Sequence, residues 1–515
     1  MFSHSCTSAG PERPITTDVT ALWPVARPVA LFAAVWSYVR LFRSTFVDDA
    51  FISLKYSAML ASRGEWGFLP ERASNTATSP LNVIVHAAVV RFTPSMVDAI
   101  VLLTAVELTL ILALLLRLSR RLFGHAWFGW LAFVTLATNC LLVSTFGLEG
   151  VLFTLLFVWA LDRFAAEDWT WLAVALAGVV LARPDGALFV FICAGALVWR
   201  RQLRWKHVGV FALMVAPWLL YSWIHLGSLV PDTLQIKLGQ RGWGRNLTLF
   251  SGLGFYYKRY PLETIAAFSL APFALAAWWT KNTAVKAVAS LAALYALVHM
   301  AAYSVAKIPP YHWYYVNQVT PIAIVGAIGL TNLVTSHWQR AALSMRVVLG
   351  AVAAAPALGL VISMSHLGFP LKEAPIHTNW GTFEQYREVG EWIHAQIPAA
   401  VPVYENSEIG TVGFYADDRL IVNEFSDANR TYGAIVERYP TLPRLARLVI
   451  DLNYFWRSVQ PELPEPGYAL MHYVVPLPKD AKVDENVVMS WETSTRWIPH
   501  GRLYLFRRTV SGSGR

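Results

Sequence analysis

Long apolar segments alternate with short polar loops over the first 367 residues of the chain. A helix needs about 20 mainly apolar residues to cross the hydrocarbon core of a bilayer. On this basis we expect about eleven membrane-spanning helices, several of them short, at 26–45, 97–116, 127–146, 148–161, 169–182, 187–199, 208–226, 262–279, 285–305, 313–333 and 346–366. Two further segments, 49–61 and 79–92, favour helices that lie in the membrane interface within the first outer loop.

The pattern changes after residue 367. Residues 383–396 have the period of an amphipathic helix, and four short segments favour strands, at 401–405, 419–424, 468–475 and 502–506. The sequence therefore predicts a polytopic helical membrane domain at 26–367 and a soluble α/β or α+β domain at 368–515. A cytoplasmic segment, 1–25, precedes them.

Composition and charge agree with this division. Apolar residues make up 56% of the chain and charged residues only 15%, which is below the quarter that is usual in soluble domains. With the N-terminus inside, the cytoplasmic loops hold 12 Lys/Arg in 44 residues and the outer loops 11 in 105, so the positive-inside rule places the C-terminal domain outside. Residues 368–515 hold 15 Lys/Arg against 18 Asp/Glu, and such a domain does not favour nucleic-acid binding.

Polar residues that carry chemistry gather in five outer loops that are far apart in the sequence. Charges at membrane depth are expensive and usually functional, so we expect these loops to converge on one face. The candidate residues are Asp48, Asp49, Glu149, Arg183, Asp185, Asp232, Lys237, Tyr311 and His312.

Each candidate has an alternative interpretation. The pair Asp48 and Asp49 favours a general base or a metal site, but two carboxylates also stabilise the start of a helix. Lys55 lies on the same helical face as Asp48 and could hold a phosphate, or it could extend to water as an ordinary surface lysine. Arg183 and Asp185 are close enough to pair with each other.

Basic residues in the loop 227–261, including Arg241 and Arg245, favour an anionic ligand such as a lipid phosphate, although a solvated loop is the alternative. We interpret Glu405 and Glu408 as surface carboxylates rather than as residues of a cavity.

Six segments together resemble a known family. They are FVDDAFISLKYSAMLASRGEWGFLPERASNTATSPLN (46–82), FGLEGVLFTLL (146–156), LARPDGAL (181–188), GSLVPDTLQIK (227–237), YHWYYVNQVTP (311–321) and VYENSEIGTVGFYADDRLIVNEFSDAN (403–429). In this order they resemble the C-type (GT-C) glycosyltransferases that use polyprenyl-phosphate sugars. The branch that contains the mycobacterial terminal β-arabinofuranosyltransferase is the most similar.

The resemblance implies an enzyme of the bacterial inner membrane that moves a sugar, with arabinofuranose favoured, from a polyprenyl phosphate to a hydroxyl of a glycan or protein acceptor, usually with inversion. It implies that Asp48 or Asp49 is the base, with Asp48 slightly favoured, and that these two residues would hold a divalent metal (Mg²⁺ or Mn²⁺) if one is used. Cations would hold the donor phosphate: Lys55, Arg183, Lys237 and His312. Contacts to substrate would come from Glu149, Asp185, Asp232 and Tyr311.

Other functions stay open at this point. The same class of enzyme could use mannose or another sugar. A transporter or flippase for a lipid-linked glycan would favour inverted repeats, which the sequence does not display. A membrane scaffold would leave the acidic pair unexplained. The sequence contains no Walker A and no HExxH motif, so an ATP-driven pump and a zinc protease of the usual kinds have no support.

Overall fold

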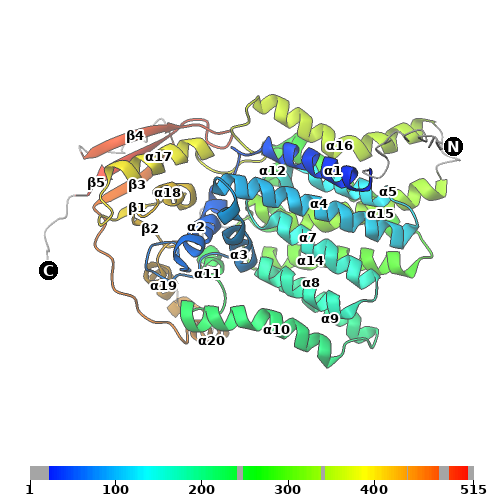
Figure 1. Ribbon diagram of the computed structural model, residues 1–515, viewed down its shortest axis with the longest axis horizontal. Helices are drawn as coiled ribbons and strands as arrows, with labels where there is room; N and C mark the ends of the chain where they lie inside the picture. The colour runs from blue at the N-terminus through cyan, green and yellow to red at the C-terminus, as the bar shows by residue number, and fades with distance from the viewer. Residues whose placement is uncertain are drawn as a thin grey trace, which may run out of the picture.

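The computed structural model describes residues 23–239, 247–337, 343–406, 408–437, 439–442, 444–474 and 486–508. Most of the predicted segment 1–25 lies outside these residues, as do Arg241 and Arg245. The described chain consists of a bundle of helices that run side by side and a smaller part at one end of the bundle, which carries a five-stranded sheet (Figure 1).

A helix is present at every one of the predicted spans. The helices of the bundle are α1 (Trp23–Arg40), α4 (Met96–Phe123), α5 (Trp127–Ala137), α6 (Cys140–Val143), α7 (Gly150–Ala165), α8 (Trp169–Ala182), α9 (Ala187–Trp199), α10 (Trp205–Tyr221), α12 (Leu249–Arg259), α13 (Pro261–Ala267), α14 (Thr283–Val305), α15 (Val316–His337) and α16 (Leu343–Leu367). Short helical turns connect or extend them: η2 (Val90–Phe92), η3 (Pro184–Gly186), η4 (Ser222–Leu226), η5 (Ala271–Trp278) and η6 (His312–Tyr315).

Six helical segments of the described chain are long and apolar enough to cross a membrane. They are Met96–Phe123, Trp205–Leu226, Pro261–Trp278, Thr283–Val305, His312–Thr335 and Val347–Leu367. Shorter apolar helices, such as α5 and α8, pack among them. The predicted polytopic helical class is confirmed.

Two predicted spans are interrupted: residues 262–279 form α13 and η5, and residues 127–146 form α5 and α6. Residues 127–146 form two helices, because Asn139 begins the second one. Its side-chain oxygen accepts a hydrogen bond from the N–H of Leu141 (3.1 Å), and its amide donates to the carbonyl of Ala267 (2.9 Å). An Asn at this position stabilises a helix start, so the long apolar run breaks there.

Three helices lie between the bundle and the sheet (Figure 1). They are α2 (Asp48–Arg63), α3 (Pro80–Val89) and α11 (Asp232–Gly239). The predicted helices in the first outer loop are thus present. Ser79 caps α3 by accepting the N–H of Asn82 (3.4 Å), and Pro80 occupies the first position, where a missing N–H costs nothing.

The C-terminal part mixes helices with a sheet. Its elements are α17 (Phe383–Gln396), β1 (Val403–Glu405), α18 (Ile409–Tyr415), β2 (Ile421–Val422), α19 (Ala428–Val436), η7 (Tyr439–Thr441), α20 (Arg444–Asn453), β3 (Tyr468–Val474), β4 (Val487–Thr493) and β5 (Gly501–Arg507). The strand order is β2-β1-β3-β5-β4. The first three strands are parallel and the last two pairings are antiparallel, with Leu470 opposite Leu505 and Trp491 opposite Leu503.

The core of the C-terminal part is shared with the first outer loop. Side chains of α17 and the sheet, such as Val389 and Leu470, belong to the same buried cluster as Tyr56, Trp66 and Phe68. The first outer loop therefore completes a core whose other half lies more than 300 residues away in the sequence.

Candidate active site

A cavity of about 400 Å³ lies between the helical bundle and the outer-loop helices α2 and α11. It brings together residues of all five predicted outer loops or their borders. The lining residues are Asp49, Ile52, Ser53, Thr76, Thr78, Leu148, Glu149, Arg183, Pro184, Asp185, Ala187, Leu188, Val230, Pro231, Thr233, Leu234, Lys237, Tyr303, Trp313 and Tyr314. The lining therefore holds two cations and three carboxylates against an otherwise mostly apolar wall.

Asp49 and Lys237 form an ion pair in this cavity. Asp49 lies in the first turn of α2, and its Oδ1 is 3.2 Å from Nζ of Lys237 on α11. The ammonium also lies 4.9 Å from the ring centre of Tyr311, 5.0 Å from that of Trp313 and 5.6 Å from that of Tyr314. Burial acts to lower the pKa of Lys237, but Tyr314 and the carboxylate of Asp49 outweigh it and hold the pKa above its usual value. Lys237 is thus a fixed cation in an aromatic setting.

Arg183 is the second cation of the cavity. The proline that follows it disfavours helical backbone at Arg183, so α8 ends there. Its Nη1 lies 2.7 Å from Oε1 of Glu149, the residue that precedes α7. Its Nη2 and Nε donate to the two oxygens of Asp185 at 2.8 and 3.1 Å. The guanidinium is thus held between two carboxylates.

Asp185 is itself held by α14 and α15. Its Oδ2 accepts hydrogen bonds from the hydroxyl of Tyr303 (2.7 Å) and the amide of Asn317 (3.2 Å), and lies 3.1 Å from Nε2 of His299. With these donors, Asp185 serves to position Arg183. Sequence reasoning missed His299 and Tyr303, although two polar residues four apart on one face of an apolar helix are a readable signal.

The carboxylate of Asp48 faces α18 instead of the cavity. Its Oδ2 and Oδ1 accept the backbone N–H groups of Gly410 (2.8 Å) and Thr411 (2.6 Å). Burial raises the pKa of Asp48 to about 6, although the hydrogen bond from Thr411 acts in the opposite direction. A Cβ at position 410 would meet the carbonyl oxygen of Asp48 at 2.0 Å, so this contact requires glycine there. Asp48 joins the first outer loop to the C-terminal part.

Glu405 and Glu408 lie beside this contact and are not surface residues. Their interpretation as surface carboxylates was therefore wrong. Glu405 is fully buried on β1, and its Oε1 accepts the backbone N–H of Glu408 (3.0 Å). Oε1 of Glu408 accepts the amide of Asn379 (2.8 Å) and the N–H of Trp380 (2.9 Å). Burial raises the pKa of Glu408 well above its usual value, and the charge of Asp48 adds to this effect.

Tyr311 is not among the residues that line the cavity, although its ring lies against the ammonium of Lys237. The structure does not bring Lys55, Asp232 or His312 into the lining either. Lys55 is buried and donates to the backbone carbonyl of Asp417, and burial lowers its pKa to about 8. Asp232 accepts the hydroxyl of Tyr454 (2.8 Å). His312 lies within 3.3 Å of the carbonyl of Ser144 and 3.1 Å of the hydroxyl of Thr378. All three make contacts that join segments of the protein.

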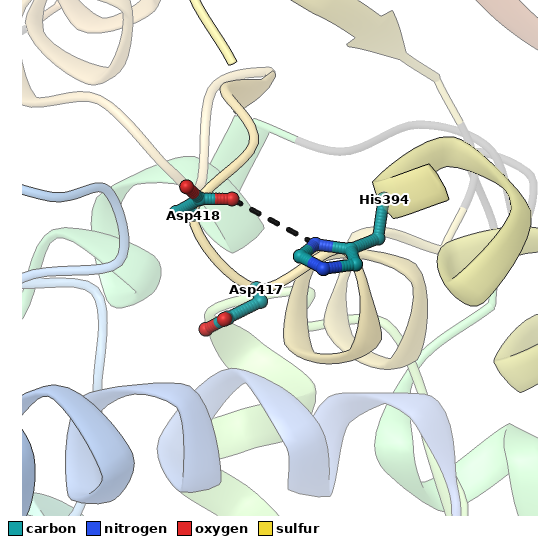
Figure 2. Close-up of side chains that lie close together, drawn as sticks. All are labelled: His394, Asp417 and Asp418. Carbon is teal, nitrogen blue, oxygen red and sulfur yellow. Dashed lines mark ion pairs between the residues drawn. The ribbon is translucent and has the colours of Figure 1, made fainter. Parts of the chain in front are cut away.

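Asp48 and Asp49 are not arranged as a joint metal site. Both oxygens of Asp48 accept backbone N–H groups, and an ammonium, which repels a divalent cation, lies beside Asp49. Figure 2 shows a different cluster, in which Nδ1 of His394 lies 3.7 Å from Oδ1 of Asp418 and Asp417 is close by. These three residues offer ligand atoms within 4.8 Å of one another, but His394 and Asp417 are exposed and none of them lines the cavity.

Comparisons with protein-family models and with curated proteins give no match. Among solved structures, ArnT from Cupriavidus metallidurans bound to undecaprenyl phosphate is 15% identical, with a TM-score of 0.57 over 96% of this chain and 100% of that chain. The oligosaccharyltransferase AglB from Archaeoglobus fulgidus, in complex with an inhibitory peptide and a dolichol-phosphate, is 11% identical, with a TM-score of 0.50 over 87% of this chain and 69% of that chain.

Arabinofuranosyltransferase AftD from Mycobacteria is also similar, at 15% identity over 74% of this chain and 29% of that chain. Its TM-score of 0.46 is too low to bear on the predicted branch, which stays a prediction. ArnT and AglB are GT-C glycosyltransferases, and the match to ArnT covers both the helical bundle and the C-terminal part. This chain therefore has the GT-C glycosyltransferase fold.

Proposed function

We propose that this protein transfers a sugar from a polyprenyl-phosphate donor to a hydroxyl group of an acceptor outside the cytoplasmic membrane. The observation that carries the proposal is the cavity, in which a carboxylate (Asp49) and a fixed cation (Lys237) lie side by side on a GT-C fold. Undecaprenyl phosphate bound to ArnT and dolichol-phosphate bound to AglB support a lipid phosphate as the carrier.

The chemistry follows from these two groups. Asp49 takes the proton of the acceptor hydroxyl while the oxygen of that hydroxyl attacks the anomeric carbon of the donor sugar. The bond from that carbon to the phosphate oxygen breaks with inversion, and the departing polyprenyl phosphate gains negative charge. Lys237 stabilises this charge. Because Lys237 is paired with Asp49 in the structure, binding of the phosphate would exchange partners and leave the carboxylate available as the base.

Arg183 is the second cation near the position of the phosphate. Its guanidinium is paired with two carboxylates, Glu149 and Asp185, which together outweigh its charge, so it contributes N–H groups in a fixed orientation and Lys237 supplies the positive charge. We assign no step to Mg²⁺ or Mn²⁺, because the surroundings of Asp48 and Asp49 do not suit a shared metal ion. In this proposal Asp48 supports the fold and Asp49 is the base, in contrast to the slight preference for Asp48 from the sequence.

Arabinofuranose is the sugar that the sequence resemblance favours, and a glycan or a protein is the acceptor class. The charge of the loops supports an N-terminus inside and a cavity outside, where a lipid-linked donor is accessible and a nucleotide sugar is not.

The test uses purified protein in lipid with a panel of polyprenyl-phosphate sugars that includes arabinofuranose and mannose. We expect one donor to be consumed, with free polyprenyl phosphate released, and Asp49→Asn to abolish turnover while Asp48→Asn retains part of it. If a donor binds but is never consumed with any of a range of glycan and peptide acceptors, the enzyme assignment is overturned in favour of a transporter. Equal turnover in wild type and Asp49→Asn would overturn the assignment of the base.

A further inference from the structure

An apolar stripe on α20 and on the turn after it faces away from the rest of the protein. Three of its side chains lie on α20, two on the turn that follows it, and one three residues further along the chain. All six are between 51% and 75% exposed: Leu448, Val449, Leu452, Phe455, Trp456 and Val459. Such a continuous stripe is unusual on a surface that faces water.

Specific contacts hold this stripe outward. Asn453, which is buried on the opposite side of α20, accepts the backbone N–H of Val230 through its Oδ1 (2.8 Å). Its backbone carbonyl accepts the N–H of Leu229 (3.2 Å). Ile450 is also buried on this side. Rotation of α20 to bury the stripe would break these contacts, so the exposure is a built feature of the fold.

The stripe continues the outer surface of a membrane-spanning helix. Trp223, in the helical turn that extends α10, donates from Nε1 to the carbonyl of Leu452 (2.9 Å). Its ring centre lies 6.3 Å from that of Phe455 and 6.4 Å from that of Trp456. Figure 1 shows α20 at this end of α10, where Ile224 is also exposed. The apolar surface of the span and the stripe of α20 therefore form one surface.

We propose that α20 lies in the interface of the lipid bilayer and anchors the C-terminal part to the membrane surface. A helix with an apolar stripe at the end of a span buries that stripe at the boundary between head groups and acyl chains. Tryptophan concentrates at this depth. Arg444 is exposed one helical turn before Leu448, where its guanidinium reaches the phosphates of the head groups.

This anchor has a direct connection to the cavity. The loop that Asn453 holds contains Val230 and Pro231, which line the cavity, and leads into α11 with Lys237. Insertion of α20 into the membrane thus fixes the loop that leads into α11, the helix that carries Lys237. The proposal depends on the position of the spans in the membrane and not on the proposed sugar transfer.

The test places a fluorophore on cysteine variants of the full chain, each in a nanodisc that holds a single copy. Leu448→Cys and Val459→Cys report on the stripe. Val488→Cys is the matched control, because Val488 is also an exposed apolar side chain (41%) but lies on β4, away from the bundle (Figure 1). Wild-type protein labelled in parallel gives the background from its own three cysteines.

We expect nitroxide-bearing lipids to quench both stripe probes at least threefold more strongly than the Val488 probe, and aqueous iodide to show the reverse order. Iodide quenching of the stripe probes equal to that of the control would overturn the proposal. Protection of the stripe probes from both quenchers would also overturn it, because another part of the protein would then cover the stripe.

Discussion

The ammonium of Lys237 lies 3.2 Å from the carboxylate of Asp49, although 188 residues separate the two in the sequence. One residue belongs to the first turn of α2 and the other to α11. This pair joins the two loops that carry the proposed base and the proposed partner of the phosphate. These two residues are therefore the first to mutate.

Replacement of Lys237 by Met removes the fixed cation while it keeps a side chain of similar length. We expect the rate of donor consumption to fall by about 100-fold or more, because the charge on the departing phosphate loses its stabilising partner. Lys55→Met is the matched control, since Lys55 is an equally buried lysine that does not line the cavity. A rate as low in Lys55→Met as in Lys237→Met would contradict the assignment.

Asp48 should make stability depend on pH in the acid range. Its pKa is about 6 in the folded protein against 3.8 for the unperturbed group, so between these values the folded state binds the proton and the unfolded state does not. The contribution of Asp48 to the free energy of unfolding is therefore greatest below pH 3.8. It decreases as the pH rises to about 6 and does not change further above that value, and the total decrease is on the order of 3 kcal/mol. Unfolding of wild type and Asp48→Asn in detergent, measured from pH 4 to 8, tests this.

In that comparison, wild type should gain stability relative to Asp48→Asn as the pH falls from 6 to 4. Glu408 contributes with the same sign, since burial also raises its pKa, and because the charge of Asp48 adds to that shift, part of the Glu408 contribution is lost in Asp48→Asn as well, in the same direction. A difference between the two proteins that does not change with pH would show that Asp48 keeps its ordinary pKa.

Gly410→Ala should loosen the contact between the first outer loop and the C-terminal part. The added methyl group would meet the carbonyl oxygen of Asp48 at 2.0 Å, which the backbone can relieve only by moving α18. We expect a loss of stability of roughly 1–3 kcal/mol. Gly433→Ala on α19 is the control, because nothing lies within 4 Å of its Cβ position, and alanine there should be neutral or stabilising by up to about 1 kcal/mol.

Asp185→Asn removes the charge that holds Arg183. Because the pair is buried, we expect thermal unfolding to report a loss of roughly 3 kcal/mol. The exposed pair of Glu492 and Arg502 offers the contrast, since Glu492→Gln should change stability by less than about 1 kcal/mol. Equal stability of Asp185→Asn and wild type would mean that Glu149 alone positions Arg183.

Chelation of divalent metals should leave the transfer rate within about twofold of the untreated value, since no step is assigned to a Lewis acid. The measurement is donor consumption after treatment with EDTA and after readdition of Mg²⁺ or Mn²⁺. Loss of activity that either ion restores would show that metal chemistry is part of the reaction.

The sequence was sufficient to predict most helices of the bundle, because each span must satisfy its own backbone hydrogen bonds within one apolar segment. It also predicted α17 with the bounds that the structure has, and four of the five strands in outline. It missed β4, the helices α11 and α12 in the predicted loop 227–261, and the short helices α18, α19 and α20. The apolar face of α20 is exposed on the surface of the protein. The pattern of apolar and polar positions in its sequence therefore does not indicate which face packs against the rest of the chain.

The candidate residues were predicted less completely, for a different reason. Charged residues in outer loops are visible in the sequence, and five of them line the cavity: Asp49, Glu149, Arg183, Asp185 and Lys237. The sequence does not predict the direction in which each of these side chains points. Asp48 and Asp49 are neighbours on a helix, about 100° apart, so one faces α18 and the other the cavity.

The contact between Asp48 and α18 also imposes an order of events on biosynthesis. The N–H of Thr411 is synthesised 363 residues after the carboxylate that accepts it, which corresponds to roughly 20–70 s of translation. During that interval the helices of the bundle that follow α1 are made, but the first outer loop lacks the partner that completes its core. A nascent chain released before residue 411 would insert into the membrane with Asp48 unsupported, so only a ribosome that passes residue 411 produces a chain whose first outer loop is fixed.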